Sequence, residues 1–350
     1  MYDVIIVGAG VAGSYLGYKL SQERNLNVLI LEKDKKTILK DSGIVSSKFL
    51  EFFPRKFVKN EISRMDFVSP SGKRMTIQTE KPFAFILKRE QFSRHLRKNA
   101  KNIKYETVEK IVDKKIYTNK NEYEYKILVG ADGANSIVAK HIGSQTKNAV
   151  GMFSIANRIK FSEINIFLNK NFSDFFSWVV PQNKEYGLIA NKNPKKYFEN
   201  FKNKLNLPPG KFHAFPIPVG YTKSYADNCL LVGDACGYTK PLTGGGIIFS
   251  LISSQHASEI ILDAFQKNRF DSKFLKRYEK ACSPIRKEID RQLWIRNIYE
   301  NLSNKDIEYL FREFSAVKLK NIRENYDKLS NIGKEIPKLK MLKAFFKVIF

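Results

Sequence analysis

Apolar and polar positions divide the start of the chain into a strand, a glycine-rich turn, a helix and a second strand. The run DVIIV is apolar and β-branched, as in a buried strand. It leads into Gly8-x-Gly10-x-x-Gly13, and the following VAGSYLGYKLSQE places leucines one helical turn apart. NVLILEK predicts a second strand, which ends in Glu32. The pattern therefore predicts a strand–helix–strand unit with glycines at the helix start.

Each glycine of this unit has a mechanical reason to be there. Gly8 allows a tight turn, Gly10 lets a pyrophosphate approach the backbone, and Gly13 lets the helix pack closely on the strand. The helix N-terminus offers free N–H groups to phosphates. Glu32 is placed to accept hydrogen bonds from an adenosine ribose. The unit predicts binding of FAD or NAD(P), and the fingerprint alone does not distinguish them.

Two later strands end in a glycine followed closely by aspartate. YKILVGADGANSIVAK (125–140) reads as a buried strand that ends at 130–133, with Ser136 at the start of a helix. LVGDACGYTKPLTGGGI (231–247) also reads as a strand, with Asp234 at its end. Three consecutive glycines, 244–246, then precede a helical run. Because glycine costs backbone entropy, such a run indicates a close approach of the backbone to another group.

One dinucleotide fingerprint with two later strand-to-Gly-Asp junctions resembles the FAD-dependent group that includes aromatic hydroxylases, flavin halogenases and geranylgeranyl reductases. The resemblance implies that Asp234 holds the ribityl hydroxyls of FAD. It also implies that Pro241 and Gly244–Gly246 bring a helix N-terminus against the flavin pyrimidine ring, where it stabilises negative charge. FILKREQFSRHL (85–96) resembles a segment of the group that places Arg89 near the cofactor. Relatives commonly carry Arg after the DGxxSxV run, whereas Ala139 and Lys140 follow here.

The stretch FFSWVVPQNKEYGLIA (175–190) narrows the choice within this group. It is similar to the aromatic-x-Trp-x-aliphatic-Pro signature of geranylgeranyl reductases, with Phe176, Trp178 and Pro181 at the matching positions. The resemblance implies that these three residues bind substrate. Halogenases have a related tryptophan-rich signature, and an aromatic strand can also serve only as core.

Three further stretches favour the geranylgeranyl reductases. The first is 231–251, which follows the form that the FAD motif has in these reductases. The others are the proline-containing strand FHAFPIPVG (212–220) and DSGIVSSKFLEFF (41–53). The last resembles a segment that usually reads Cys-Ser-Gly, and here Asp41 occupies the cysteine position. That cysteine is thought to lie near the flavin, so an altered substrate or impaired activity is an open alternative. Asp41 is the one candidate catalytic residue.

The resemblance implies a set of cofactor-binding positions. They are Gly8, Gly10, Ala12, Gly13, Glu32, Asp41, Ser42, Gly43, Arg89, Asp234, Gly237, Pro241, Gly244, Gly245, Gly246 and Ile247.

Composition adds an electrostatic expectation. Lysine and arginine number 61 against 35 aspartate and glutamate, a formal net charge of +26, which favours polyanionic partners. The lysine excess is equally consistent with genome base composition. Three scattered cysteines argue against a disulfide framework or a zinc site. His95, His213 and His256 stand in no metal or acid–base spacing, so we expect structural roles for them and no bound metal.

The last stretch, KLKMLKAFFKVIF (338–350), predicts a basic amphipathic helix that starts after Pro337. Three lysines fall on one side of its wheel and an aromatic, aliphatic face lies opposite. Such a helix suits an anionic membrane surface, although it could also pack on its own domain. The chain shows no signal peptide, no spanning segment and no nucleic-acid-binding motif. We therefore expect a cytoplasmic protein, peripheral on the inner face of the membrane, and no nucleic-acid partner.

These observations predict an α/β fold with a discontinuous Rossmann-like FAD domain (1–60, 88–147 and 222–300). An antiparallel-sheet substrate domain (61–87 and 148–221) is inserted, with a hairpin at 64–79, and a helical basic region (301–350) closes the chain. The resemblance implies FAD-dependent reduction of isolated C=C bonds in geranylgeranyl chains, and we expect the substrate to be an archaeal-type membrane glycerophospholipid or else a prenyl diphosphate. Since no second GxGxxG occurs, the electrons must come from a transient donor, NAD(P)H or a ferredoxin-like protein. The alternatives are a monooxygenase or halogenase, and a flavin-binding membrane protein without turnover.

Overall fold

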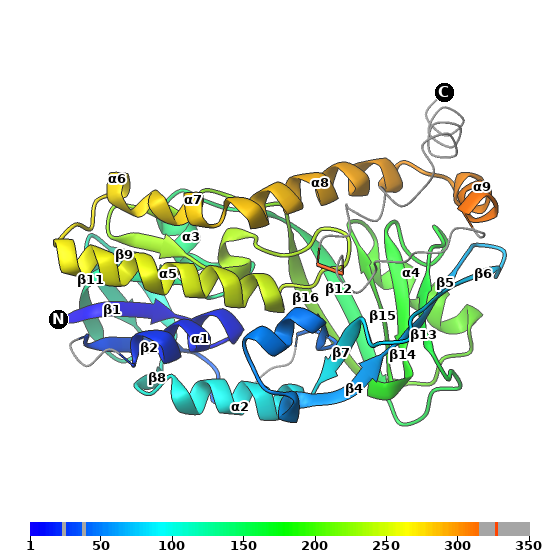
Figure 1. Ribbon diagram of the computed structural model, residues 1–350, viewed down its shortest axis with the longest axis horizontal. Coiled ribbons are helices and arrows are strands. Elements are labelled where there is room, and N and C mark those ends of the chain that lie inside the picture. Colours follow the sequence, from blue (N-terminus) through cyan, green and yellow to red (C-terminus); the bar gives the residue numbers. More distant parts are fainter. Residues whose placement is uncertain (23–25, 37–39, 315–325, 328–350) are drawn as a thin grey trace.

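Three β-sheets and a set of helices make up an elongated molecule in which the two larger sheets lie at opposite ends (Figure 1). The computed structural model describes residues 1–22, 26–36, 40–314 and 326–327. The N-terminal sheet lies at the left of Figure 1, and the second large sheet lies at the right.

The first sheet is the dinucleotide-type sheet that the sequence predicts. Its order is β17-β18-β11-β1-β2-β8, and every pair from β18 to β8 is parallel. A β9–β10 hairpin extends from β11. The strands are β1 (Tyr2–Val7), β2 (Val28–Glu32), β8 (Ile103–Tyr105), β9 (Val108–Val112), β10 (Lys115–Thr118), β11 (Glu122–Gly130), β17 (Tyr225–Ala226) and β18 (Cys229–Leu231).

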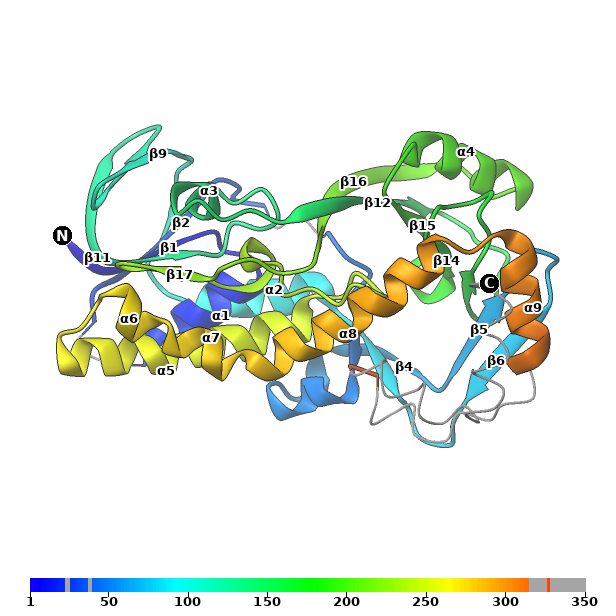
Figure 2. The same cartoon turned by 90° about the horizontal axis from the view of Figure 1, so that it is seen from above.

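Helices cover this sheet because its strands are apolar on both faces. In Figure 2, α1, α2 and α5 lie on one side of it, and α3 lies on the other with the β9–β10 hairpin. The α1 helix packs between α5 and α2, and the buried residues of β1, β2, β11 and β18 form one core with them. The helices are α1 (Val11–Leu20), α2 (Arg89–Asn99), α3 (Ile137–His141), α5 (Ile247–Lys267), α6 (Ser272–Leu275) and α7 (Arg277–Ala281).

The second sheet has the order β16-β12-β15-β14-β13-β5-β6. The expected hairpin at 64–79 is present as the antiparallel pair β5–β6 and joins this sheet. The sheet is antiparallel except between β13 and β5, which run parallel. These two strands come from separate insertions, so no tight turn forces them to be antiparallel. The strands are β5 (Arg64–Val68), β6 (Arg74–Gln78), β12 (Lys147–Ala156), β13 (Ile164–Phe167), β14 (Phe176–Val180), β15 (Glu185–Ala190) and β16 (Gly210–Val219).

A small third sheet connects the two large ones. It has the order β3-β7-β4, so β7 leaves its neighbours in sequence, β5 and β6, and pairs instead with β3 and β4. Residues 61–87, which the sequence grouped with the substrate domain, are therefore divided between two sheets. The elements here are β3 (Ile44–Ser46), β4 (Val58–Ile62), β7 (Ala84–Leu87) and the 3₁₀ turns η1 (Ser47–Glu51) and η2 (Arg55–Phe57).

The long helix α8 (Ser283–Glu300) runs from the first sheet toward the second, and α9 (Asn304–Phe314) follows it (Figure 2). Arg296 on α8 is only 2% exposed. Its guanidinium donates to the carbonyl of Pro241 at 2.9 Å and to Oδ1 of Asn191 at 3.0 Å. This side chain therefore ties the glycine-rich turn before α5 to the loop between β15 and α4 (Pro194–Lys204).

The expected amphipathic helix at 338–350, with its lysine and apolar faces, lies outside the described residues. Within the described part of the C-terminal region, α9 is helical as expected. None of the described helices has both the length and the apolar character that crossing a bilayer would need.

Candidate functional site

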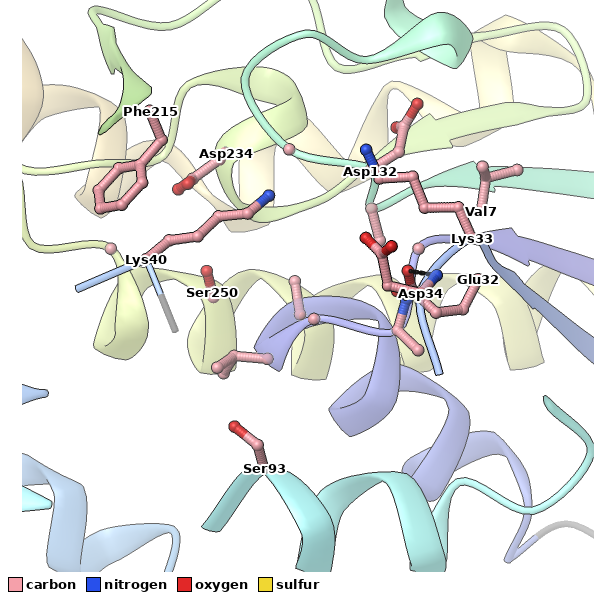
Figure 3. A pocket seen from close by; sticks show the side chains of 18 of the residues that line it. Val7, Glu32, Lys33, Asp34, Lys40, Ser93, Asp132, Phe215, Asp234 and Ser250 are labelled. Atoms are coloured by element: carbon pink, nitrogen blue, oxygen red, sulfur yellow. Dashed lines mark hydrogen bonds between the residues drawn. The ribbon is translucent and has the colours of Figure 1, made fainter. Parts of the chain in front are cut away.

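A cavity of about 450 Å³ lies where the parallel strands of the first sheet end. Its walls come from the residues that follow β1, β2 and β11, from the start of α1 and α5, and from α2 and β16. Figure 3 shows Glu32, Asp34 and Asp132 at one end of it. Asp234 and Phe215 lie at the other end. In open α/β sheets, ligands bind at the carboxyl edge of the strands, and this cavity has that location.

The glycine fingerprint forms the floor of the cavity. Gly8 has φ +100° and lies so close to Ala131 that a Cβ would come within 2.4 Å of its carbonyl oxygen. A Cβ on Gly13 would meet the carbonyl oxygen of Gly8 at 1.9 Å, so helix and strand could not pack this closely with any other residue. Gly10 differs, because its Cβ would project into open space. The first N–H groups of α1 therefore face the cavity beside a surface free for a ligand.

Glu32 closes the end of the cavity near β2. Its carboxylate accepts from the backbone N–H of Ala9 at 2.7 Å and from that of Asp34 at 2.9 Å. Arg97 lies 3.5 Å from the same carboxylate and donates to the carbonyl oxygens of Ala9 and Asp34. These contacts hold Glu32 in a single place at the cavity wall.

Arg97 is a residue of the site that the sequence motifs do not predict. Arg89, Ser93 and Arg97 all line the cavity from α2. Their four-residue spacing places them along one side of the helix, and this was the signal available in the sequence.

Asp132 is a second acidic residue that the sequence motif contained and that was not assigned. Its carboxylate accepts from the hydroxyl of Ser136 at 2.5 Å and from the N–H of Ile137 at 2.7 Å. It thereby holds the start of α3, which Ser136 caps as expected. Burial raises the pKa of Asp132 above its ordinary value.

Asp234 lies across the cavity at the end of β18, in the 3₁₀ turn η4 (Gly233–Cys236). Its Oδ1 accepts from the hydroxyl of Thr239 at 2.8 Å, and burial raises its pKa. Gly246 packs so tightly against this carboxylate that a Cβ would come within 2.8 Å of Oδ1. The aspartate and the glycine-rich turn therefore form one unit at the start of α5.

Gly244 brings that unit into contact with the second sheet. It has φ +70°, and a Cβ there would lie 2.8 Å from Cδ1 of Ile189 on β15 and 3.5 Å from Cδ1 of Ile217 on β16. Ile189 and Ile217 belong to an apolar cluster that also contains Phe176 and Trp178. The turn expected to contact flavin thus faces the sheet expected to bind substrate.

Asp41 and Arg89 form a two-point ion pair at the cavity wall. Nε of Arg89 donates to Oδ1 of Asp41 at 2.8 Å, and Nη2 donates to Oδ2 at 2.7 Å. Oδ1 also accepts from the N–H of Gly43 at 2.8 Å. Gly43 has φ +68°, and a Cβ there would lie 2.5 Å from Cγ of Arg89. Asp41, the candidate catalytic residue, is thus an anchor for arginine in this structure.

The substrate candidates Phe176 and Trp178 lie on β14 and pack in apolar clusters. Pro181 begins the 3₁₀ turn η3 (Pro181–Asn183). The walls of the cavity, as described, include none of these three residues. Trp178 instead pairs with Gly187 of β15 and donates its indole N–H to Oε1 of Glu185 at 2.7 Å. Glu185 was not singled out in the sequence, where it reads as a polar residue beside a turn.

The cavity thus brings together most of the expected cofactor residues. The expected residues among its walls are Gly8, Gly10, Ala12, Glu32, Asp41, Arg89, Asp234, Gly244, Gly246 and Ile247. The remaining ones, which lie behind or beside the described walls, are Gly13, Ser42, Gly43, Gly237, Pro241 and Gly245.

Gly237, for example, has φ +77° and packs on Gly220, where a Cβ would meet the carbonyl oxygen at 2.0 Å. Lys240 lies beside Gly245 and pairs with Asp327 at 3.0 Å. Tyr326, the other described residue of that segment, lies against the ring of Phe83. These glycines therefore serve the packing of the turn.

The residues present fit FAD. Nη1 of Arg89 is buried and has no hydrogen-bond partner among the described residues, so a donor is left for a ligand. Gly10 and Gly133 leave open space where a Cβ would stand, at two points of the cavity wall. Carboxylates for hydroxyl groups lie at both ends, and the N–H groups of α1 lie between them for phosphates.

The histidines and cysteines lie elsewhere. His95 packs on the rings of Phe53 and Phe57, and His213 stacks on Phe153. The three cysteines are buried free thiols. In the part of the chain that the structure describes, no group of three His, Cys, Asp or Glu side chains gathers as a metal ion would require.

Comparisons of the sequence relate this chain to oxidoreductases. Residues 2–164 match the family described as pyridine nucleotide-disulphide oxidoreductase. A digeranylgeranylglycerophospholipid reductase of Methanocaldococcus jannaschii is 28% identical, covering 89% of this chain and 90% of the relative. Digeranylgeranylglycerophospholipid reductase 2 of Methanothermobacter thermautotrophicus is 24% identical, covering 92% of this chain and 94% of the relative.

Comparisons of the fold agree. A geranylgeranyl bacteriochlorophyll reductase-like protein of Thermoplasma acidophilum superposes with a TM-score of 0.82 at 21% identity, covering 95% of this chain and 98% of its own. The halogenase PltM in complex with FAD gives a TM-score of 0.63 at 14% identity, covering 99% and 97%. The resemblance to geranylgeranyl reductases, the Rossmann-like FAD-binding fold and FAD as the cofactor are thereby confirmed. The chain is an FAD-dependent oxidoreductase.

Gly43→Ala should weaken FAD retention. The new Cβ would push Arg89 away from Asp41 at the cavity wall, in addition to the ~1–2 kcal/mol that a left-handed conformation costs a non-glycine residue. The matched control is Gly143→Ala, because Gly143 has φ +67° with nothing near its Cβ. Flavin absorbance per protein after gel filtration should fall for Gly43→Ala alone. Equal retention in both variants would show that the Asp41–Arg89 pair does not support the cofactor.

Glu185 should make the stability of the protein depend on pH. Burial raises the pKa of this carboxyl from 4.5 to about 7 in the folded protein. The stabilisation by the protonated form is therefore complete below about pH 4.5 and is lost as the pH rises to about 7. Relative to Glu185→Gln, the wild-type free energy of unfolding should fall by on the order of 3 kcal/mol across this window. Denaturant unfolding at several pH values measures it, and parallel curves for the two proteins would contradict the assignment.

Proposed function

We propose that this FAD-dependent oxidoreductase reduces isolated C=C bonds in the geranylgeranyl chains of archaeal-type membrane glycerophospholipids. The observation that supports it most directly is the contact between Gly244 of the flavin turn and Ile189 and Ile217 of the second sheet. Ile217 also lines the cavity, so the apolar cluster of the second sheet borders the space in which an isoprenoid chain would lie beside the cofactor. The relatives named digeranylgeranylglycerophospholipid reductase supply the class of substrate.

The residues of the cavity would hold the cofactor at separate points. The N–H groups at the start of α1 would bind the pyrophosphate beside Gly10, and Glu32 would accept from the adenosine ribose. Asp234 would accept from the ribityl hydroxyls at the far end of the cavity. Arg89 would direct its unpartnered Nη1 to the cofactor, with Asp41 keeping the guanidinium in place.

The bound cofactor, once reduced, supplies a hydride for one carbon of the double bond. The chain's part is to hold the alkene in a dry, apolar setting and to provide a proton for the other carbon. Ile189, Ile217 and Phe176 would exclude water from the reacting carbons. The N-terminus of α5, behind Gly246, would stabilise negative charge on the reduced ring.

The proposal also includes a transient electron donor and an anionic membrane surface. NAD(P)H or a ferredoxin-like protein would dock transiently to deliver electrons. The formal charge of +26 favours an anionic membrane surface on which the lipid substrate is present, with the chain on the cytoplasmic side. A prenyl diphosphate would be attracted by the same charge.

Two rival functions remain distinct from this one. The fold is shared with halogenases and with a Pseudomonas aeruginosa protein described as a probable FAD-dependent monooxygenase, which has a TM-score of 0.65 at 13% identity. Oxygen chemistry is therefore the first rival. The second is a flavin-binding protein without turnover, because Asp41 stands at the position where the resembling family usually has cysteine.

Anaerobic turnover tests the proposal. The flavin is reduced with dithionite, geranylgeranylated glycerophospholipid is added, and flavin reoxidation is followed together with lipid mass. We expect reoxidation with a gain of two hydrogens for each bond reduced. A phytanyl-type lipid of the same headgroup, which has no double bond, is the control and should leave the flavin reduced.

Other outcomes of this experiment, or of an Asp41 variant, would favour one of the two rival functions. Flavin that stays reduced until oxygen enters, with a hydroxylated or halogenated product, would establish oxygen chemistry. If Asp41→Cys created lipid reduction that the wild-type protein lacks, the protein without turnover would be favoured.

Removing residues 338–350 should weaken binding to anionic vesicles, because the sequence there predicts a basic amphipathic segment. Co-sedimentation with vesicles that contain anionic lipid measures the loss, and flavin absorbance should be unchanged. Neutral vesicles serve as the control. Equal binding of the full-length and shortened chains to anionic vesicles would refute a membrane role for this segment.

A further inference from the structure

One buried carboxyl group lies between the loop that precedes β3 and the apolar face of the second sheet. Glu185, the first residue of β15, is 3% exposed. Its Oε1 accepts from the indole N–H of Trp178 at 2.7 Å and also from the hydroxyl of Ser42. The group therefore connects β14 of the substrate sheet with the loop that precedes β3.

Local geometry explains why the three side chains meet. Trp178 and Gly187 are opposite each other in the β14–β15 ladder, as are Val180 and Glu185. A Cβ on Gly187 would lie 2.6 Å from Cζ2 of Trp178, so only glycine lets the indole lie across β15 toward Glu185. The signature of Trp followed by Pro and Gly thus places an indole N–H on a buried acid.

The loop is held against this sheet by further contacts. The side-chain amide of Asn183 donates to the carbonyl of Ser42 at 2.7 Å. On the neighbouring strand β4, Lys59 also donates to the carbonyl of Gln182 at 2.7 Å, which joins the third sheet to the same turn. The backbone of Ser42 is thereby fixed beside the cavity wall, which its neighbour Asp41 lines.

The charges around Glu185 are few. Asp41, which is paired with Arg89, raises the pKa of Glu185, and Lys59 lowers it. The largest effect is the loss of water around the carboxyl, which raises the pKa to about 7 although the hydrogen bonds from Ser42 and Trp178 lower it. Near neutral pH the group therefore exchanges a proton, as a general acid should.

We propose that Glu185 supplies, through Ser42, the proton that saturation of the double bond requires. This inference rests on the proposed function. The bond gains a hydride, which brings both electrons from the reduced cofactor, and a proton. Protonated Glu185 donates to Oγ of Ser42, the reverse of the direction seen with the carboxylate, and this frees the Ser42 hydrogen. The O–H bond of Ser42 then breaks as its proton goes to the second alkene carbon. The proton of Glu185 moves to Oγ of Ser42, which leaves a carboxylate that water reprotonates.

Other acidic groups of the site are less suited to this step. Asp41 is occupied by Arg89 and by the N–H of Gly43. Asp132 holds the start of α3. Asp234 lies at the turn that would contact the cofactor itself. Glu185 is the acid that touches a residue of the expected substrate signature, Trp178.

The first measurement needs no substrate. The chain has two tryptophans, so the holoprotein labelled with ¹⁵N-tryptophan should show two indole N–H resonances, which Trp294→Phe assigns. The resonance of Trp178 should shift between pH 5 and 9 with a midpoint near that of Glu185, about 7. The shift should vanish in Glu185→Gln. A Trp178 resonance that does not titrate, or that titrates equally in Glu185→Gln, would overturn the proposal.

The second measurement is the anaerobic single turnover of flavin by geranylgeranylated lipid as a function of pH. The wild-type rate should be highest below about pH 7 and fall about tenfold per pH unit above it, because the protonated form is active. Glu185→Gln and Ser42→Ala should each be about 100-fold slower at pH 6 and have no such pH dependence. Glu185→Asp should restore part of the rate. Glu288→Gln, another buried glutamate, should retain the wild-type profile.

The outcomes separate the inference from the function on which it rests. A wild-type protein that reduces the lipid while Glu185→Gln matches it in rate and pH profile would overturn this inference and leave the proposed function standing. A wild-type protein that does not reduce the lipid would overturn the proposed function, and with it the role of Glu185 as the proton source. Retained flavin absorbance in each variant shows that the site is still loaded.

Discussion

Parallel pairing on both sides of β1 is the constraint on which the rest of the molecule depends. β1 pairs with β2 on one side and with β11 on the other, and β18 continues the sheet beyond β11. Because all four strands run in the same direction, their carboxyl ends meet at one edge. The groups that follow them, from Gly8 to Asp234, are separated widely in sequence and yet line one cavity.

Close backbone contact maintains this edge. Gly8 lies against Ala131, and Gly13 lies against Gly8, at distances that exclude any side chain. Glycines also allow close packing at the other end of the cavity, where Gly246 packs on Asp234 and Gly244 packs on Ile189. Glycines thus fix two separations: that of α1 from β1 at one end of the cavity, and that of the turn before α5 from the second sheet at the other.

Charge in the site follows from how each acid is compensated. Glu32 and Asp41 have arginine partners and backbone N–H donors. Glu185 is buried, Asp132 and Asp234 are partly buried, and all three have only hydroxyl, indole or backbone donors; loss of water around them raises the pKa of each. Neutral donors compensate a buried carboxylate less than a guanidinium does, so these acids are the ones that hold protons more readily.

Local patterns in the sequence determined the strand–turn–helix unit, the strand ends at Asp132 and Asp234, and the hairpin of β5 and β6. They did so because hydrophobic periodicity and glycine placement depend on neighbours in the chain. The same reasoning could identify Glu32, Arg89 and Asp234 as candidates, since each stands beside a recognisable motif. Local sequence patterns could not identify residues whose partners lie far away along the chain.

The tertiary structure alone decided which side chains meet. It placed Arg97 on Glu32, paired Asp41 with Arg89, and moved β7 into a sheet apart from β5 and β6. It also brought Ser42 to Glu185 across 143 residues of sequence. The physical reason is that burial and hydrogen bonding of a polar group depend on the full three-dimensional surroundings, whereas the sequence records only its neighbours along the chain.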